Sequence, residues 1–124
     1  MKQWVFNLIL AILSVFAPAK SMILSGLSLV LIDLMTGILA SRKQGIKITS
    51  SGLQRTIVKL AVYEIAIMLA FLVQHYMVAE IPVANIVSSF VGITELKSCL
   101  ENIDILSGGD FLKSIIERLG SSNK

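Results

Sequence analysis

The sequence predicts an all-α, polytopic membrane protein with four transmembrane helices, or three, followed by a short amphipathic helix. The first observation is composition: 55% of the 124 residues are apolar and 15% are charged, against about 45–50% and about 25% in soluble domains. The second is charge placement, because only Lys20 and Asp33 are charged between Lys2 and Arg42. A small water-soluble domain needs more polar surface than this. The composition therefore argues against a soluble enzyme and against a disordered chain.

Four apolar blocks, separated by charged residues, define the expected spans. Residues 21–41 and 60–79 carry one charge each and reach the roughly 20 residues that a spanning helix needs. Residues 3–19 carry no charge and just reach a spanning length. Residues 81–94 extend only about 21 Å as a helix, less than the roughly 30 Å of the hydrocarbon core. This fourth block crosses if its helix continues through residues 95–100 or if the bilayer thins, and a re-entrant segment is the alternative.

The first block has two interpretations. Lys2, the apolar run after it and Ala17-Pro18-Ala19 resemble the three parts of a secretory signal peptide. However, a second long apolar block follows almost at once. We therefore expect the first two blocks to form a helical hairpin that turns at Pro18, Ala19 and Lys20.

The basic residues predict how the chain is oriented in the membrane. A basic loop between the second and third blocks contains Arg42, Lys43, Lys47, Arg55 and Lys59. Lys2 precedes the first block, and the residues after the fourth block include Lys97, Lys113, Arg118 and Lys124. With four spans these ten residues share one side and Lys20 lies alone on the other, whereas the partition falls to six and five if the fourth block does not cross. Because basic residues accumulate on the cytoplasmic side, we expect the basic loop and both termini in the cytoplasm.

The C-terminal segment is amphipathic rather than uniformly apolar. Residues 107–109 are Ser-Gly-Gly, which breaks a helix, and Asp110 is a plausible N-cap for the next one. The apolar residues that follow recur at helical spacing: Phe111, Leu112, Ile115, Ile116 and Leu119. We expect this helix to lie on the membrane surface or against a neighbour. The expected organisation is a transmembrane domain over 1–106, with spans at about 3–19, 21–41, 58–79 and 81–100, and a cytoplasmic tail over 107–124.

Polar and small residues form a stripe on two of the apolar blocks. The second block carries Ser25, Gly26, Asp33, Thr36, Gly37 and Ala40, and the fourth carries Asn85, Ser88, Ser89, Gly92, Glu95, Cys99 and Asn102. Acids within a membrane are rare and mark functional sites, while small residues let helices approach closely. Each stripe is therefore either a contact within a helix bundle or a face that lines water in an assembled pore. Glu64, about one turn inside the third block, is expected to be an interfacial anchor that pairs with Lys59 or another base.

No signature of an enzyme, a cofactor site or a metal site competes with this interpretation. The chain has no Gly-rich phosphate loop, no G-x-S-x-G and no H-E-x-x-H. Cys99 is the only cysteine and His75 the only histidine, and neither has partners at a suggestive spacing. The basic residues lie between apolar blocks and form no patch with aromatic residues, so nucleic acid is not an expected partner.

Three motifs carry a resemblance to a known family. The second block ends with Asp33, Thr36, Gly37 and Ala40 in D-x-x-T-G-x-x-A spacing, the basic loop contains Ser50-Ser51, Arg55 and Lys59, and Glu95-Leu96, Ser98 and Glu101-Asn102 follow the last block. In this order they resemble the toxin-secretion/phage-lysis holin family, and the resemblance covers residues 22–119. It implies a protein that accumulates in the cytoplasmic membrane of a bacterial host and oligomerises into holes. Through such holes an endolysin reaches the cell wall, and some relatives are linked to toxin export.

The stripes and motifs together give the candidate residues for oligomerisation or pore lining. They are Gly26, Asp33, Thr36, Gly37, Asn85, Ser88, Ser89, Gly92, Glu95, Ser98, Glu101 and Asn102.

Two other functions are also consistent with a chain of several short apolar helices. A small multidrug-type transporter carries its coupling carboxylate in the first span, where this chain has only Asn7 and Ser14. A membrane anchor or adaptor would dock a cytoplasmic partner through residues 42–59 and the tail.

Overall fold

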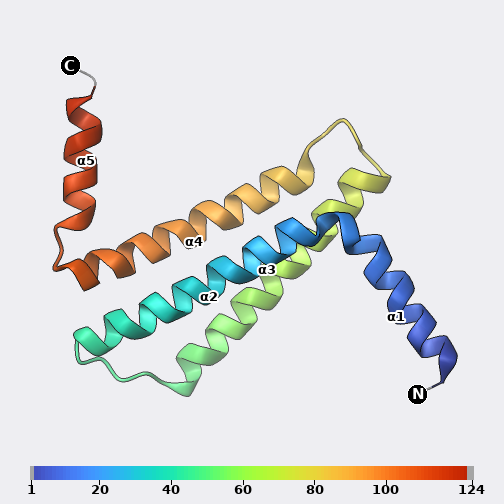
Figure 1. Cartoon of the computed structure of the whole chain (residues 1–124), viewed down its shortest axis with the longest axis horizontal. Coiled ribbons are helices and arrows are strands. Elements are labelled where there is room, and N and C mark those ends of the chain that lie inside the picture. The colour runs from blue at the N-terminus through green and yellow to red at the C-terminus, as the bar shows by residue number, and fades with distance from the viewer. Residues whose placement is uncertain (1, 123–124) are drawn as a thin grey trace.

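The computed structural model describes residues 2–122, which form five α-helices and one 3-10 turn (Figure 1). The elements are α1 (Gln3–Phe16), η1 (Ala17–Ala19), α2 (Lys20–Lys43), α3 (Ser50–Tyr76), α4 (Val83–Ser107) and α5 (Phe111–Ser121). No strand occurs among the described residues, so the predicted all-α class is confirmed. The long helices α2, α3 and α4 pack together as a bundle, and α1 and α5 leave it at opposite ends (Figure 1).

Within residues 2–122, three helical segments are long and apolar enough to cross a membrane: Gln3–Lys43, Ser50–Tyr76 and Val83–Ser107. Helices α2, α3 and α4 have 24, 27 and 25 residues. At 1.5 Å per residue they extend about 36–41 Å, more than the roughly 30 Å of hydrocarbon. The helix of the fourth block continues past residue 94, because α4 is unbroken from Val83 to Ser107.

The expected hairpin between the first two blocks is wrong. The chain remains helical from α1 through η1 into α2, as one bent segment of 41 residues. Pro18 lies in the first turn of η1, where its missing N–H would have no helical partner in any case, so it bends the helix without reversing the chain. The rings of Phe16 and Phe71 lie 6.2 Å apart beside this bend. Beyond it, α1 points away from the bundle (Figure 1), and none of its residues is buried.

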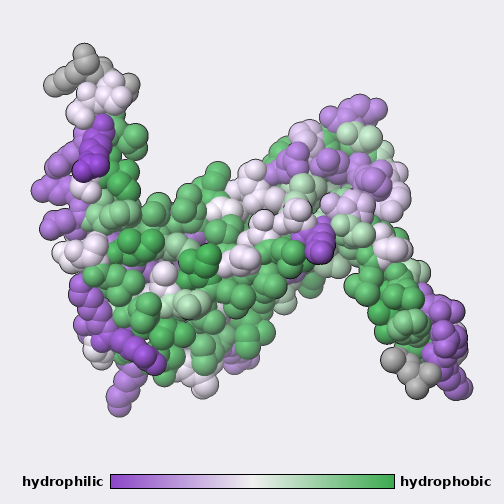
Figure 2. Space-filling model, viewed as in Figure 1, coloured by the Kyte–Doolittle hydropathy of each residue, from purple (hydrophilic) through white to green (hydrophobic). Residues whose placement is uncertain are grey.

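The surface of the bundle is apolar, and its core is thin. The largest fully buried side chains are Ile67, Glu95 and Val30. Many large apolar side chains are instead exposed, among them Ile65 at 57% and Ile93 at 70%. Figure 2 shows apolar residues over the middle of the bundle, with hydrophilic residues toward its ends and along α5. A soluble monomer rarely exposes such a large apolar surface, whereas helices that face lipid do so.

Polar side chains cap the first turns of α3 and α4. Thr49 precedes α3, and its hydroxyl accepts a hydrogen bond from the Gly52 amide at 3.2 Å. At the other end of α3, the Gln74 side-chain oxygen accepts the Ala84 amide of α4 at 2.8 Å. Each bond satisfies a first-turn N–H that has no partner within its helix. The predicted basic loop is largely helical in the structure. The connection between α2 and α3 covers only residues 44–49 and contains Lys47, whereas Arg42 and Lys43 end α2 and Arg55 and Lys59 lie within α3.

The junction between α4 and α5 follows the expected break but not the expected cap. Gly108 and Gly109 have φ values of 94° and 90°, the left-handed region that glycine enters readily. Asp110 stands at the N-cap position of α5 but makes no capping hydrogen bond. Instead the Asp104 carboxylate of α4 accepts the Leu112 amide at 2.9 Å. The left-handed glycines turn the chain sharply after α4, which brings the Leu112 amide at the start of α5 within reach of Asp104.

Candidate functional site

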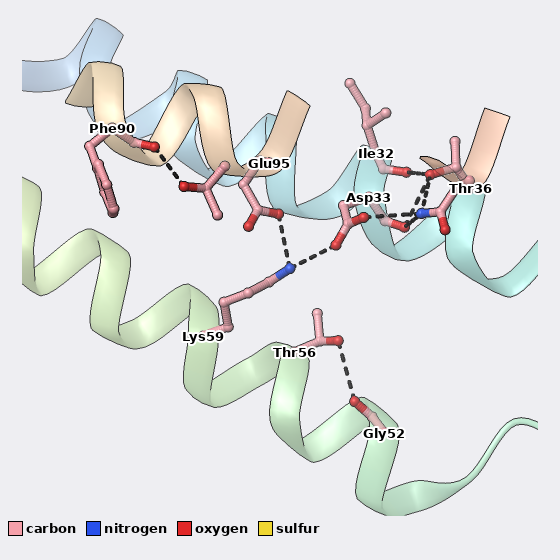
Figure 3. A network of polar contacts seen from close by, with 10 residues as sticks. Ile32, Asp33, Thr36, Gly52, Thr56, Lys59, Phe90 and Glu95 are labelled. Carbon is pink, nitrogen blue, oxygen red and sulfur yellow. Dashed lines mark hydrogen bonds and ion pairs between the residues drawn. The ribbon is translucent and has the colours of Figure 1, made fainter. Parts of the chain in front are cut away.

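A single ammonium group joins the three bundle helices in their interior. Lys59 of α3 donates to Asp33 Oδ2 of α2 at 2.7 Å and to Glu95 Oε2 of α4 at 2.9 Å (Figure 3). The Glu95 side chain is 1% exposed, that of Asp33 is 12% exposed and that of Lys59 is 29% exposed. We call these three residues the ion cluster. It places two acids and one base inside the part of the protein that is expected to cross the membrane.

Asn102 extends the ion cluster along α2. Its side-chain amide donates to Asp33 Oδ1 at 3.1 Å, to the Asp33 carbonyl oxygen at 3.3 Å and to Thr36 Oγ1 at 3.1 Å. The Thr36 hydroxyl in turn donates to the Ile32 carbonyl at 2.9 Å (Figure 3). Gly37 permits this approach, because a Cβ at that position would lie 3.4 Å from the Asn102 side-chain nitrogen.

The ion cluster and its extension through Asn102 contain candidates from both sequence stripes. Asp33, Thr36 and Gly37 come from the stripe on α2, and Glu95 and Asn102 come from the stripe on α4. The polar atoms of these side chains pair with one another and with Lys59 inside one chain. This favours the interpretation of the stripes as contacts within a helix bundle. Their role in oligomerisation or pore lining stays a prediction.

The expected pairing of Lys59 with Glu64 is wrong. Lys59 reaches Asp33 and Glu95, while both carboxylate oxygens of Glu64 are buried without a hydrogen-bond partner among residues 2–122. The observed pairing follows from where α2 ends and α3 begins. Asp33 lies ten residues before the end of α2, and Lys59 lies ten residues after Thr49 at the start of α3, so antiparallel helices bring them to the same level.

A second polar feature is a groove between α2 and α4 toward the end that carries α1. Its volume is about 290 Å³, and its lining includes Ser21, Ser25, Gly26, Ser88, Ser89 and Gly92. The Ser88 hydroxyl is buried and has no hydrogen-bond partner within the described chain. Ser25 and Ser89 are exposed. We call this feature the serine groove. It interrupts an otherwise apolar surface with small and polar residues.

The remaining candidate residues lie outside these two features. Asn85 is exposed near the start of α4. Ser98 lines a different cavity at the opposite end of the bundle. Glu101 is exposed, and its carboxylate lies 3.8 Å from the Lys97 ammonium on the same helix. An exposed pair of this kind contributes little to stability.

The profile of the bacteriophage holin family matches residues 10–121, a range that contains the ion cluster and the serine groove. No curated protein and no solved structure gives a significant match. The family comprises membrane pore-forming proteins and not enzymes. Its match over most of the chain agrees with the apolar bundle, which is that of a multi-pass membrane protein. This chain therefore belongs to the bacteriophage holin family.

Proposed function

We propose that this protein oligomerises in the cytoplasmic membrane of a bacterial host and opens holes that release an endolysin to the cell wall. Family membership supports the class of function. The observation that carries the oligomerisation is the serine groove, a set of small and polar residues exposed on a surface that otherwise suits lipid. A second copy of the chain is the occupant that this groove fits best, because small residues let helices approach and hydroxyl groups can bond across the interface.

We attribute the tendency of the chain to oligomerise to the serine groove rather than to the ion cluster. Asp33 and Glu95 are already neutralised in part by Lys59 inside one chain. The Ser88 hydroxyl has no partner, and Ser25 and Ser89 face outward. Hydrogen bonds between membrane helices contribute about 0.6 kcal/mol each on average. Several such bonds per copy, together with close packing at Gly92, favour association that depends on the amount of protein in the membrane.

The orientation that we propose places the connection between α2 and α3, together with the C-terminus, in the cytoplasm. Arg42, Lys43 and Lys47 lie at that end of the bundle, as the positive-inside rule requires. A fourth crossing by α1 requires the bend at Pro18 to close into a hairpin. The N-terminus is then cytoplasmic as well, and the basic residues other than Lys59 of the ion cluster divide nine to one. If the bent α1 lies along the outer surface, Lys2 joins Lys20 outside, and the same residues divide eight to two. Protease access to an N-terminal epitope tag in intact spheroplasts distinguishes the two arrangements.

The proposed function is tested by expressing the chain with a cytoplasmic endolysin that has no export signal of its own. We expect sudden lysis after a delay, and cross-linking of the membranes should give a ladder of oligomers. Ser89→Val removes a hydroxyl from the serine groove and should lengthen the delay while shifting the ladder toward monomers. Thr94→Val is the matched control, because Thr94 is exposed on the same helix but its hydroxyl bonds to its own helix at Phe90.

Two results would contradict the proposal. If the wild-type chain inserts into the membrane but leaves the endolysin inside the cells, it does not form holes of the required size. If Ser89→Val and Thr94→Val behave alike in timing and in cross-linking, the serine groove is not the contact between copies.

A further inference from the structure

A polar cavity occupies the end of the bundle opposite α1. Here α3 diverges from α2 toward the short connection between them (Figure 1), and the space left among α2, α3 and α4 has a volume of about 340 Å³. Its lining includes Asp33, Ser41, Thr56, Ser98 and Asn102. Gln44 and Lys47 also line it, and both are exposed at the end of the bundle. The cavity therefore opens toward the side that we propose to be cytoplasmic.

The cavity reaches deep into the span. Asp33 lies at its inner end, ten residues before Lys43 at the end of α2. Ten helical residues rise about 15 Å, which is half of the roughly 30 Å hydrocarbon core. Beyond Asp33 the bundle closes, because Lys59 and Glu95 bridge the three helices.

The size and lining of this cavity suit water. A water molecule occupies about 30 Å³ of liquid volume, and buried water requires polar partners. A cavity of 340 Å³ has room for about ten molecules at that volume, and hydroxyl, amide and carboxylate groups line it. Ionisable side chains within a membrane usually face a water-filled cavity or the interior of a bundle. Asp33 does both.

We propose that this cavity is an aqueous vestibule, open to the cytoplasm, that ends at the ion cluster in the middle of the membrane. The inference rests on the proposed insertion of α2, α3 and α4 but not on hole formation. In each copy, the barrier to hydrophilic solutes is then the segment of the bundle from Glu95 to the start of α4 at Val83. An apolar cluster that includes Phe71 and Ala84 fills the far end of this segment.

The vestibule is tested by cysteine labelling at two adjacent positions of equal depth. Leu34 lines the cavity, whereas Met35 is 64% exposed on the outer surface of the bundle. Leu34→Cys and Met35→Cys are made in a Cys99→Ala background. A cationic, membrane-impermeant methanethiosulfonate reacts with a thiolate that water reaches. In inside-out vesicles that retain a trapped dye, we expect Leu34→Cys to react at least tenfold faster than Met35→Cys.

A second pair of positions on α4 guards against a local folding defect in either α2 variant. Ser98 lines the cavity, and Leu96 is 52% exposed on the outside. Ser98→Cys should react at least tenfold faster than Leu96→Cys in the same vesicles. In right-side-out vesicles, which present the outer face to the reagent, none of the four variants should react.

The possible results separate this inference from the proposed function. Equal reactivity within both pairs, or labelling of the cavity positions from the outer face, would overturn the vestibule even if lysis is normal. The expected contrast in a chain that never releases the endolysin would uphold the vestibule and contradict hole formation. Release of the chain from membranes by alkaline carbonate would overturn both, because it shows that the helices do not span.

Discussion

Replacing Lys59 by methionine removes the cation that Asp33 and Glu95 share. The resulting loss in the free energy of unfolding can be worked out from the distances in the structure. Its contacts of 2.7 and 2.9 Å correspond to attractions of about 6 kcal/mol each at an effective dielectric constant of about 20. Desolvation of the three groups offsets much of this attraction. Losing one partner of a buried ion pair lowers the free energy of unfolding by about 3–5 kcal/mol. Because the Lys59 side chain is 29% exposed, we expect a loss near 3 kcal/mol.

Removing one of the two acids should lower the free energy of unfolding much less than removing Lys59, because two carboxylates share one ammonium group. Both contacts meet at the Lys59 nitrogen, so the two carboxylate oxygens lie no more than 5.6 Å apart, the sum of 2.7 and 2.9 Å. At that distance they repel by at least about 3 kcal/mol on the same scale. Glu95→Gln removes this repulsion together with one attraction, and it leaves a neutral pair of Lys59 and Asp33. We expect it to lower the free energy of unfolding by less than about 1.5 kcal/mol.

The assay is reversible unfolding in mixed micelles of dodecyl maltoside and increasing sodium dodecyl sulfate, followed by circular dichroism. Lys59→Met should lower the free energy of unfolding at least twice as much as Glu95→Gln. A triple variant that also carries Asp33→Asn and Glu95→Gln should recover most of the loss, because no unpaired charge then remains. Equal losses for the two single variants, or a stable Lys59→Met, would refute the shared-cation account.

Three further predictions concern close packing, helix capping and function. Gly26→Ala should lower the free energy of unfolding by about 1 kcal/mol, the lower end of the range for overpacking, since its Cβ would lie 2.9 Å from a Glu64 carboxylate oxygen, the movable end of a flexible side chain. Gly92→Ala, with 3.9 Å to its nearest neighbour, should stay near wild type. Gln74→Ala should lower the same quantity by about 1 kcal/mol and speed amide exchange in the first turn of α4, whereas unchanged exchange would show that the cap is dispensable. Asp33→Leu should delay or abolish triggering in the endolysin assay, and wild-type timing and oligomer size would count against any role for the ion cluster in lysis.

The sequence predicted the helices well where long apolar blocks define them. The block at 21–41 became α2, and the polar stripe of the fourth block correctly indicated that its helix continues to Glu95 and beyond. The sequence predicts the start of α3 too late, because Ser50-Ser51 and the basic residues after them are typical of a loop. Those residues follow Thr49, whose hydroxyl caps the first turn, so charge alone did not mark the end of a helix.

The contacts between helices were harder to predict than the helices themselves. The sequence points to Asp33, an acid within an apolar block, but it does not identify the partner of this acid, since Lys59 also lies near Glu64 on the same helix. The distance along one helix is known from sequence, whereas the level at which two helices meet depends on how the loop between them is capped. The same reason explains why Asp104, rather than the nearer Asp110, meets the start of α5.

The connection of three helices through one nitrogen atom also bears on the cooperativity of the bundle. If any one of α2, α3 or α4 moved into lipid alone, it would carry an unpaired charged side chain with it or leave one behind. Charges at the centre of a bilayer are strongly disfavoured, so partly separated bundles are rare species at equilibrium. In the assembly that we propose, whole three-helix units therefore dock with one another, and the perimeter of a hole grows in steps of one chain.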